Sequence, residues 1–497
     1  MSDPIEAELW PHPEWRQKTT RNLVSKNLKQ QTQPIFRLVL VALCIHGVEI
    51  APAKAEEANS GPPTGISESS IATNLPENGD PGGVRAALAG RGITYGANYT
   101  GEVFGNPTGG FKRGAIYEGF LELYVDTDFE KLAGWKGLTF HATGYQLHGQ
   151  GLTVNNAGNL NSLSNIEATP STRLFDLWFE QALLDNKLSV RFGQLRVDYS
   201  GEFLSVTPGG VFMSANFGWP SFTGNNLPSG GVTFPLAAPG VRVKFEPTDR
   251  LTLLFGAYND DPAGPCDGDP QVCNDHGLEF RIKDKPFLIA EAQFKYNQGK
   301  TAGGLPGLFK IGAFKDYGDF DSQRVDDKGL SLADPLSSGV PAKQKRNHGA
   351  YAIIEQQIYQ LPGGNSEKGV TAFARIAGLP SDRNLVDFYV EGGLNFSGLV
   401  PSRPNDVFGL GATYSHISRD AARLDRDTVA FGTPTPIRDY EILLEMTYQA
   451  QIIPGWSVQP DLQYFWHTGG NVPNINAAPG TPIADTLVLG LRSTINY

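Results

Sequence analysis

From about residue 91 to the C-terminus, apolar and polar residues alternate with a period of two. The segments GAIYEGFLELYVD, YEILLEMTYQAQ, WSVQPDLQYFW and TLVLGLRSTINY all show this pattern. Successive side chains of a β-strand point to opposite faces of a sheet, so the pattern predicts strands with one apolar and one polar face. The breaks between the runs contain Gly, Pro, Asn and Asp, as strand connections usually do. The sequence therefore predicts an all-β fold.

The breaks fall into two length classes that largely take turns along the chain. Short breaks such as LLDNKL and IIPGW alternate with long ones such as 148–172, 199–240 and 317–347. This parity is expected of a transmembrane barrel with short periplasmic turns and long extracellular loops. Counting on it gives about 16 strands in one closed antiparallel barrel over residues 91–497, an even number as such barrels have.

One hairpin, LFDLWFEQALLDNKLSVRFGQ from Leu174, shows which two faces alternate. A turn at Asp185-Asn186 sets a register in which Glu180 lies opposite Arg191 on the polar face. On the apolar face, which begins at Phe175, the same register makes two pairs: Leu183 with Leu188, and Phe179 with Phe192. A soluble sandwich and a membrane barrel with a watery lumen both fit this hairpin.

The two ends of the chain favour the barrel. At the C-terminus, alternate apolar residues lead to Tyr497, which is similar to the C-terminal signature of bacterial outer-membrane barrels. Near the N-terminus, a basic stretch without acids is followed by the apolar run Leu38–Ile45 and then by Ala53-Lys54-Ala55. These are the parts of a secretory signal peptide, predicted here over residues 1–55. A buried strand is the alternative interpretation of the apolar run, which is far shorter than the ~20 residues of a membrane-spanning helix.

Residues 56–90 are predicted to be a periplasmic leader. Their Ser, Pro, Glu and Asn content predicts disorder over 56–80, and one short helix could form within Gly82–Gly92. Without residues 1–55 the chain keeps 34 Lys or Arg and 47 Asp or Glu, a charge of −13. This surplus of acids argues against a nucleic-acid partner.

The two cysteines that remain, Cys266 and Cys273, are predicted to form a loop disulfide in an oxidising compartment. Their spacing does not match a familiar metal site, so no metal is expected. The sequence also shows no Ser–His catalytic arrangement and no Gly-rich phosphate-binding loop. We therefore expect neither an enzyme nor a cofactor.

If the apolar face contacts lipid, the polar face lines a lumen filled with water. The predicted lumen-facing residues are Glu118, Phe120, Glu122, Asp176, Trp178, Glu180 and Arg191. A ring such as that of Phe120 or Trp178 can stack on the C–H face of a sugar while charged groups bind its hydroxyls. The alternatives are that Trp178 packs under a loop or in an aromatic girdle, and that Glu180 and Arg191 merely support the wall.

The break at 199–240 is rich in Gly, Pro and aromatic residues and contains no Lys or Arg. Such a segment is too apolar to remain in water, so we expect it to fold against the barrel. It would narrow the pore with Phe217, Trp219 and Phe222. A lid over the mouth or a contact between subunits is the alternative.

The chain resembles the carbohydrate-selective porins of the OprB type. Three stretches carry the resemblance: LFDLWFEQALLDNKLSVRFGQLRVD, VTAFARIAGLPSDRNLVDFYVEGGLNFSGLVPSRPNDVFGLGATYSHIS and EMTYQAQIIPGWSVQPDLQYFWHTGG. The resemblance implies a channel of sixteen strands that favours monosaccharides such as glucose. Two departures are Pro81, where the family usually has an aromatic residue, and His467-Thr468, where it commonly has Asn-Pro.

We therefore predict a passive outer-membrane channel for the diffusion of small carbohydrates into the periplasm. Its expected partners are small sugars and outer-membrane lipid, and we expect either a monomer or a homotrimer. The alternatives are a porin that is non-selective or weakly cation-selective, and a secreted soluble β-protein that binds glycans.

Overall fold

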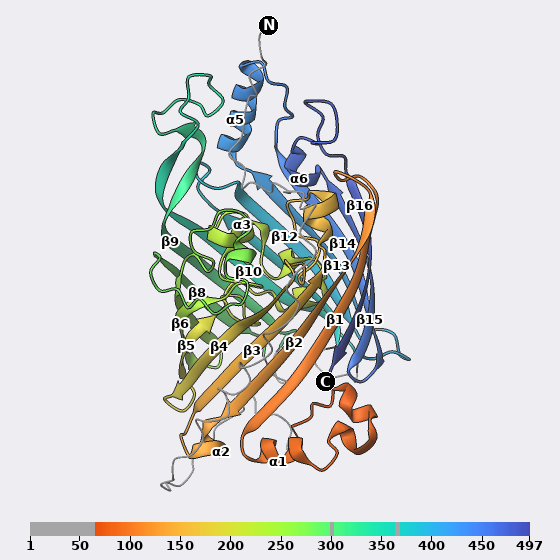
Figure 1. Cartoon of the computed structure of the whole chain (residues 1–497). Coiled ribbons are helices and arrows are strands. Elements are labelled where there is room, and N and C mark those ends of the chain that lie inside the picture. The colour runs from red at the N-terminus through yellow and green to blue at the C-terminus, as the bar shows by residue number, and fades with distance from the viewer. Residues whose placement is uncertain (1–64, 299–302, 363–367) are drawn as a thin grey trace, which may run out of the picture.

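The computed structural model describes residues 65–298, 303–362 and 368–497 (Figure 1). The predicted signal peptide at 1–55 lies outside these residues. Within them, sixteen strands form one closed antiparallel barrel in which each strand pairs with its neighbours in the chain and β1 pairs with β16. The predicted fold class and strand number are confirmed.

The strands of the first half are β1 (Ile93–Thr108), β2 (Gly114–Asp128), β3 (Leu138–Gly149), β4 (Ser171–Leu183), β5 (Leu188–Leu195), β6 (Ala238–Thr248), β7 (Leu251–Asn259) and β8 (Pro286–Tyr296). The strands of the second half are β9 (Gly307–Asp326), β10 (Pro341–Gln360), β11 (Gly369–Gly378), β12 (Val386–Ser397), β13 (Val407–Ile417), β14 (Tyr440–Ile453), β15 (Trp456–Trp466) and β16 (Thr486–Asn496). The helices are α1 (Val84–Gly90), α2 (Phe129–Ala133), α3 (Ser221–Gly224), α4 (Pro270–Cys273), α5 (Arg419–Ala430) and α6 (Thr468–Asn471). None of these helices is long and apolar enough to cross a membrane.

The alternation places apolar side chains on the outside of the barrel and charged ones inside. On the outer face, Leu491 is 51% exposed and Ile376 is 47% exposed. On the inner face, Lys310 is 0% exposed and Glu391 is 1% exposed. This distribution is the reverse of that in a water-soluble sandwich, so the barrel interpretation of the period-two pattern holds.

The register of the β4–β5 hairpin is the predicted one: Glu180 pairs with Arg191. The position of Phe175, which we expected on the outer face, is different. Phe175 and Asp176 together lie opposite the single residue Thr143, because the β3–β4 register shifts there. A bulge of this kind turns an extra side chain to the same face. Phe175 is therefore buried inside, at 0% exposure.

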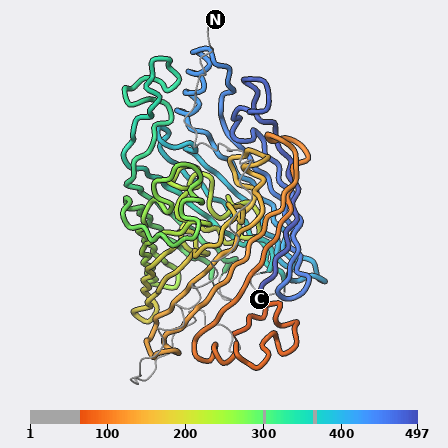
Figure 2. The backbone as a smooth tube through the Cα atoms, viewed as in Figure 1, coloured from red at the N-terminus to blue at the C-terminus, as the bar shows by residue number. Residues whose placement is uncertain are grey.

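Two of the long connections, 150–170 and 196–237, fold into the barrel, where the second of them runs across its middle (Figure 2). Buried apolar residues of these connections pack with inward residues of the wall in one cluster, which includes Phe212, Phe217, Phe373 and Tyr389. The interior of the barrel therefore has an apolar core of its own beside its charged wall. Access through the lumen depends on how these two connections are held.

Two other segments differ from the sequence-based expectation. The break at 317–347 is shorter than expected, because β9 continues to Asp326 and β10 begins at Pro341. The connection after β13 contains α5, although we expected no helix there. Ser418 caps this helix by accepting a hydrogen bond from the Ala421 N–H at 3.3 Å, and Asp425 binds Arg438 at 2.9 Å.

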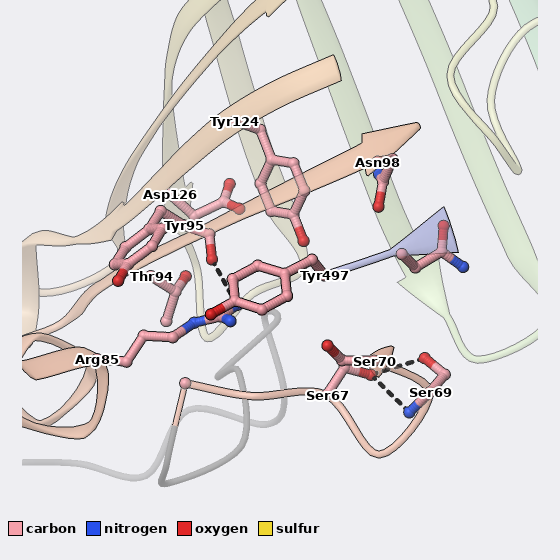
Figure 3. A pocket seen from close by; sticks show the side chains of 12 residues that line it. Ser67, Ser69, Ser70, Arg85, Thr94, Tyr95, Asn98, Tyr124, Asp126 and Tyr497 are labelled. Atoms are coloured by element: carbon pink, nitrogen blue, oxygen red, sulfur yellow. Dashed lines mark hydrogen bonds between the residues drawn. The ribbon is translucent and has the colours of Figure 1, made fainter. Parts of the chain in front are cut away.

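Residues 65–80, which we expected to be disordered, are ordered beneath the barrel. Short 3-10 helices span Ile71–Asn74 and Pro76–Gly79. The guanidinium of Arg85 lies between the rings of Tyr95 and Tyr497, at 5.1 and 4.8 Å from their centroids (Figure 3). The Tyr497 hydroxyl donates to the Gly79 carbonyl at 2.7 Å. The last residue of the chain thus fastens this segment to the barrel.

We predict that Arg85→Ala loosens this segment, because the change removes both ring contacts and the hydrogen bond to the Tyr95 carbonyl. Tyr497→Phe should have a smaller effect, about 1 kcal/mol, since it removes one hydrogen bond. Limited trypsin digestion followed by mass spectrometry measures cleavage at Arg91. Cleavage as slow in Arg85→Ala as in the unchanged protein would contradict the prediction, and Arg113→Ala at the opposite end of the barrel is the control.

Candidate functional site in the barrel lumen

A ladder of aromatic and arginine side chains runs along the inner wall over β3, β4, β5 and the start of the next connection. His141 stacks on Trp178, with ring centroids 5.0 Å apart. The Arg191 guanidinium lies 4.4 Å from the rings of both Trp178 and Tyr199. The Arg196 guanidinium also contacts the Tyr199 ring, at 4.7 Å from its centroid. We call these five residues the aromatic–arginine ladder.

Two carboxylates hold the ladder in place beside a third arginine, Arg242. Glu180 binds Arg191 at 2.8 Å and Arg242 at 3.0 Å. Glu202 binds Arg242 at 2.8 Å and approaches Arg191 at 3.5 Å. Two cations and two anions thus form a closed network whose formal charges cancel. Such a network fixes the arginine planes without giving this part of the lumen a strong net charge.

Local backbone features explain why these groups meet. Asp185 and Asn186 have φ values of +53° and +66°, as the tight turn between β4 and β5 requires. The turn places Glu180 beside Arg191. Asp176 faces inward by the same alternation as Glu180, and its carboxylate lies 3.7 Å from Arg196.

The ladder keeps unused hydrogen-bonding capacity. Among the described residues no hydrogen-bond partner binds Trp178 Nε1 or Arg191 Nη1 of the ladder, or Oδ1 of the neighbouring Asp198. Leaving a buried polar atom unpaired costs about 1–3 kcal/mol. A cluster of such atoms beside partly exposed side chains is expected where a polar solute or water supplies the missing partners.

Charged residues elsewhere on the wall have a different task, which is to hold the backbone of the connection 196–237. Arg375 on β11 donates to the carbonyls of Asn216 at 2.6 Å and Gly218 at 3.2 Å. It is paired with Glu391 on β12 at 2.8 Å, and both side chains are fully buried. We call this pair the loop latch.

Further wall residues bind the same connection through its main chain. Glu445 accepts from the Met213 N–H at 2.6 Å. The other such contacts are Glu291 with the Leu204 N–H, Lys310 with the Ser205 carbonyl, Glu355 with the Thr207 N–H and Gln459 with the Val211 carbonyl. Most of these wall residues are therefore saturated by the connection and are not available to a solute.

Of the three aromatic residues predicted to narrow the pore, Phe217 and Phe222 attach the connection to the wall, through Phe373 and Tyr389. Phe217 is 1% exposed and stacks on Phe212, with centroids 4.1 Å apart. Phe222 is 0% exposed and packs on Tyr389 at 5.4 Å. Trp219 is half-buried and its Nε1 donates to a carbonyl of the same connection at 2.8 Å. The buried Phe217 and Phe222 present no ring surface to an open lumen.

Of the predicted lumen residues, the structure brings Trp178, Glu180 and Arg191 together in or beside the ladder, and Asp176 joins them through Arg196. It places Glu118, Phe120 and Glu122 elsewhere on the inner wall, in the sites described next. Glu118 is 3% exposed beneath the connection 150–170.

Phe120 packs edge-on against Tyr145, with ring centroids 4.7 Å apart, and Glu122 accepts from the Asn98 amide at 2.7 Å. Neither residue contacts the ladder directly.

Sequence reasoning missed several residues of the site. Arg242 could have been found, because Val241 and Val243 flank it and the same alternation turns it inward. Arg196, Tyr199 and Glu202 could not, because they follow the last residue of β5, where no period orients side chains.

Cys266 and Cys273 are joined by a disulfide in the connection after β7. Their Cα atoms are 6.1 Å apart. The part of the chain that the structure describes holds no cluster of His, Cys, Asp and Glu suited to a metal ion.

Comparison with known proteins identifies the chain. The sequence profile of the carbohydrate-selective porin, OprB family, matches residues 112–497. The chain belongs to this family. It is a sugar-selective channel of the bacterial outer membrane, and the prediction of a channel rather than an enzyme is confirmed.

Relatives of the OprB family support the assignment. Porin B of Pseudomonas aeruginosa is 27% identical over 416 residues, which cover 79% of this chain and 87% of that protein. The high-pH structure of Pseudomonas putida OprB matches with a TM-score of 0.72 at 23% identity, over 84% of this chain and 97% of that one. The low-pH structure of the same protein matches with a TM-score of 0.50 at 20% identity, over the same shares.

We predict that releasing the loop latch widens the channel of this OprB-family protein. Arg375→Met alone leaves Glu391 buried without a cationic partner and should destabilise the barrel by about 3–5 kcal/mol. The double variant Arg375→Met/Glu391→Gln avoids the unpaired charge but still frees the backbone of Asn216 and Gly218. Its single-channel conductance and current noise in planar bilayers should rise. Unchanged conductance, as expected of the control Arg250→Met in a periplasmic turn, would contradict the prediction.

The connection 150–170 should loosen as the pH rises. Desolvation raises the pKa of Glu167 from 4.5 to about 7, while this side chain accepts from the N–H groups of Thr153 and Val154. The folded connection thus keeps a proton that an unfolded chain releases. The stabilisation that the raised pKa of Glu167 gives to the connection is complete below about pH 4.5 and is lost as the pH rises through about 7.

Hydrogen exchange of peptides from 150–170, corrected for intrinsic rates, should show more opening at about pH 8 than at about pH 5. Glu167→Gln, which cannot titrate, should remove the difference. The same pH dependence in both proteins would assign the effect to another group.

Proposed function

We propose that the aromatic–arginine ladder is the sugar-selecting site and that it favours monosaccharides such as glucose. The observation that carries this proposal is the alternation of aromatic faces with arginine planes whose hydrogen-bonding capacity is unused. The exposed parts of the Trp178 and Tyr199 rings offer apolar surface to the C–H side of a pyranose. The guanidinium and carboxylate groups offer donors and acceptors for its hydroxyls.

The electrostatics of the site favour a neutral solute. Arg191 and Arg242 are balanced by Glu180 and Glu202, so a simple ion gains little from entering this network. A sugar instead exchanges its hydration for several weak contacts along the ladder. Contacts that are weak and repeated permit both entry and release, as passive conduction requires.

We also propose that the apolar outer face lies in the hydrocarbon of the outer membrane. Exposed side chains such as Leu491, Phe255 and Ile376 supply the apolar surface that a membrane barrel needs. Every strand pairs on both sides, so no strand edge is left unpaired in lipid. A predicted signal peptide at 1–55 is consistent with export to this membrane.

The proposal is tested by replacing Trp178. Trp178→Ala removes the partly exposed ring that lies between His141 and Arg191, and should weaken block of ion current by glucose about three- to ten-fold. Ion conductance without sugar should change little. Trp178→Phe should restore part of the affinity, and Trp466→Ala on the outer face is the matched control.

Two results would contradict the proposal. An equal loss of sugar block and ion conductance in Trp178→Ala would mean that Trp178 only supports the wall. Equal flux of sugars and of other uncharged solutes of similar size in liposome swelling assays would mean that the ladder does not select sugars.

A further inference from the structure

A hollow of about 830 Å³ lies on the outer face of the barrel over β9, β10, β11 and the start of β12. Its lining includes Ala313, Lys315, His348, Ala350, Gly378 and Asp387. Lys315 pairs with His348, and Ala313 pairs with Ala350 one step nearer the periplasm. The small side chains of alanine and glycine create the depression, and the two basic residues border it on its extracellular side.

The hollow marks the upper limit of the apolar outer face. Toward the periplasm, the outward residues of β9 and β10 are Phe309, Ile311 and Ile354, which are 42%, 57% and 45% exposed. Beyond Lys315 and His348 the outward residues of both strands are polar or charged, apart from Tyr317. The hollow therefore lies where hydrocarbon gives way to lipid headgroups.

Two cations converge beside the hollow without a carboxylate partner. Lys315 Nζ and Arg346 Cζ lie 5.2 and 5.5 Å from the same ring, that of Tyr317. Among the described residues neither cation belongs to an ion pair. Arg346 has a φ of +66° and lies at a register shift between β9 and β10. Bulges of this kind re-aim a side chain, and positive φ in a non-glycine residue is often associated with a function.

The acids nearest to these cations are mostly engaged elsewhere. Asp387 binds His416 at 2.6 Å, Asp382 binds Arg383 at 2.8 Å and Asp321 binds Lys343 at 2.6 Å. Asp319 lies further toward the extracellular end, beyond Tyr317. The border of the hollow thus keeps positive charge in a protein whose formal net charge is −11.

We propose that this hollow binds the phosphate-bearing headgroup of a lipid in the outer leaflet. Lys315 and Arg346 contact the phosphate, and His348 contacts the adjoining polar part of the headgroup. The acyl chains extend along the apolar surface of Phe309, Ile311 and Ile354. Arginine and lysine bind phosphate through charge-assisted hydrogen bonds, and each such cation at a membrane surface strengthens binding measurably. The site is independent of the sugar-selecting ladder inside the barrel.

The experiment measures lipid retention by native mass spectrometry. The mature protein in nonionic detergent is mixed with equal amounts of phosphatidylcholine and diphosphorylated lipid A. The unchanged protein should retain lipid A in preference. Lys315→Gln/Arg346→Gln should reduce that retention about 30-fold, as two lost surface cations predict. Lys112→Gln/Arg113→Gln, with the same charge change on the connection between β1 and β2, should not reduce it.

Three results would overturn the proposal. The first is equal retention of lipid A by the double variant and the unchanged protein. The second is equal retention of dephosphorylated and diphosphorylated lipid A. The third is displacement of lipid A by millimolar inorganic phosphate, which would make the hollow a site for the free anion. If the double variant lacks the heat-modifiable migration of a folded barrel, Arg346→Gly decides, since glycine suits the positive φ and removes the charge.

Discussion

The need to pair every backbone N–H and C=O group in an apolar medium determines this structure. Sixteen strands meet it by closing on themselves, so that no strand edge remains open. Closure in turn reverses the usual arrangement of side chains, because the outside of the barrel is apolar and the inside must accept everything polar. The interior therefore holds many ionisable groups at close quarters, and each of them needs a partner.

Most of these partners come from the inward connections. The wall carboxylates and cations that bind the main chain of 196–237 include Glu291, Arg375 and Glu445. The ladder differs from them because Arg191 binds carboxylates and aromatic faces and not the main chain of the connection. Binding to the main chain of a connection separates groups that build the channel from groups suited to recognise a solute. Polarity and inward direction alone do not make that separation.

Alternation, the lengths of the breaks and the two ends of the chain together predict the closed barrel and the strand number, and the turn at Asp185-Asn186 predicts the pairing of Glu180 with Arg191. The alternation predicts the wrong face for a side chain where a bulge interrupts the two-residue period. The bulge opposite Thr143 turns Phe175 inward, and a bulge leaves no mark in a two-residue pattern. Residues of connections, such as Tyr199, reach the site through long-range packing that no local pattern encodes.

The buried positions of Phe217 and Phe222 have the same cause. The composition of 199–240 indicates that the segment folds inward, but it does not determine which rings face the wall. The family resemblance and the inward aromatic residues indicated the solute class, and the alternation gave three residues at the candidate site. The site residues from the connection after β5 became visible only with the fold.

The contacts that hold 196–237 have an evolutionary consequence. The polar side chains of the wall bind mainly the peptide groups of this segment, and every amino acid supplies a peptide group. Side chains along this segment can therefore be exchanged with little effect on its attachment, provided that the buried rings are kept. Related channels can therefore change the solutes that they select through substitutions in this one segment, while the surrounding barrel stays unchanged.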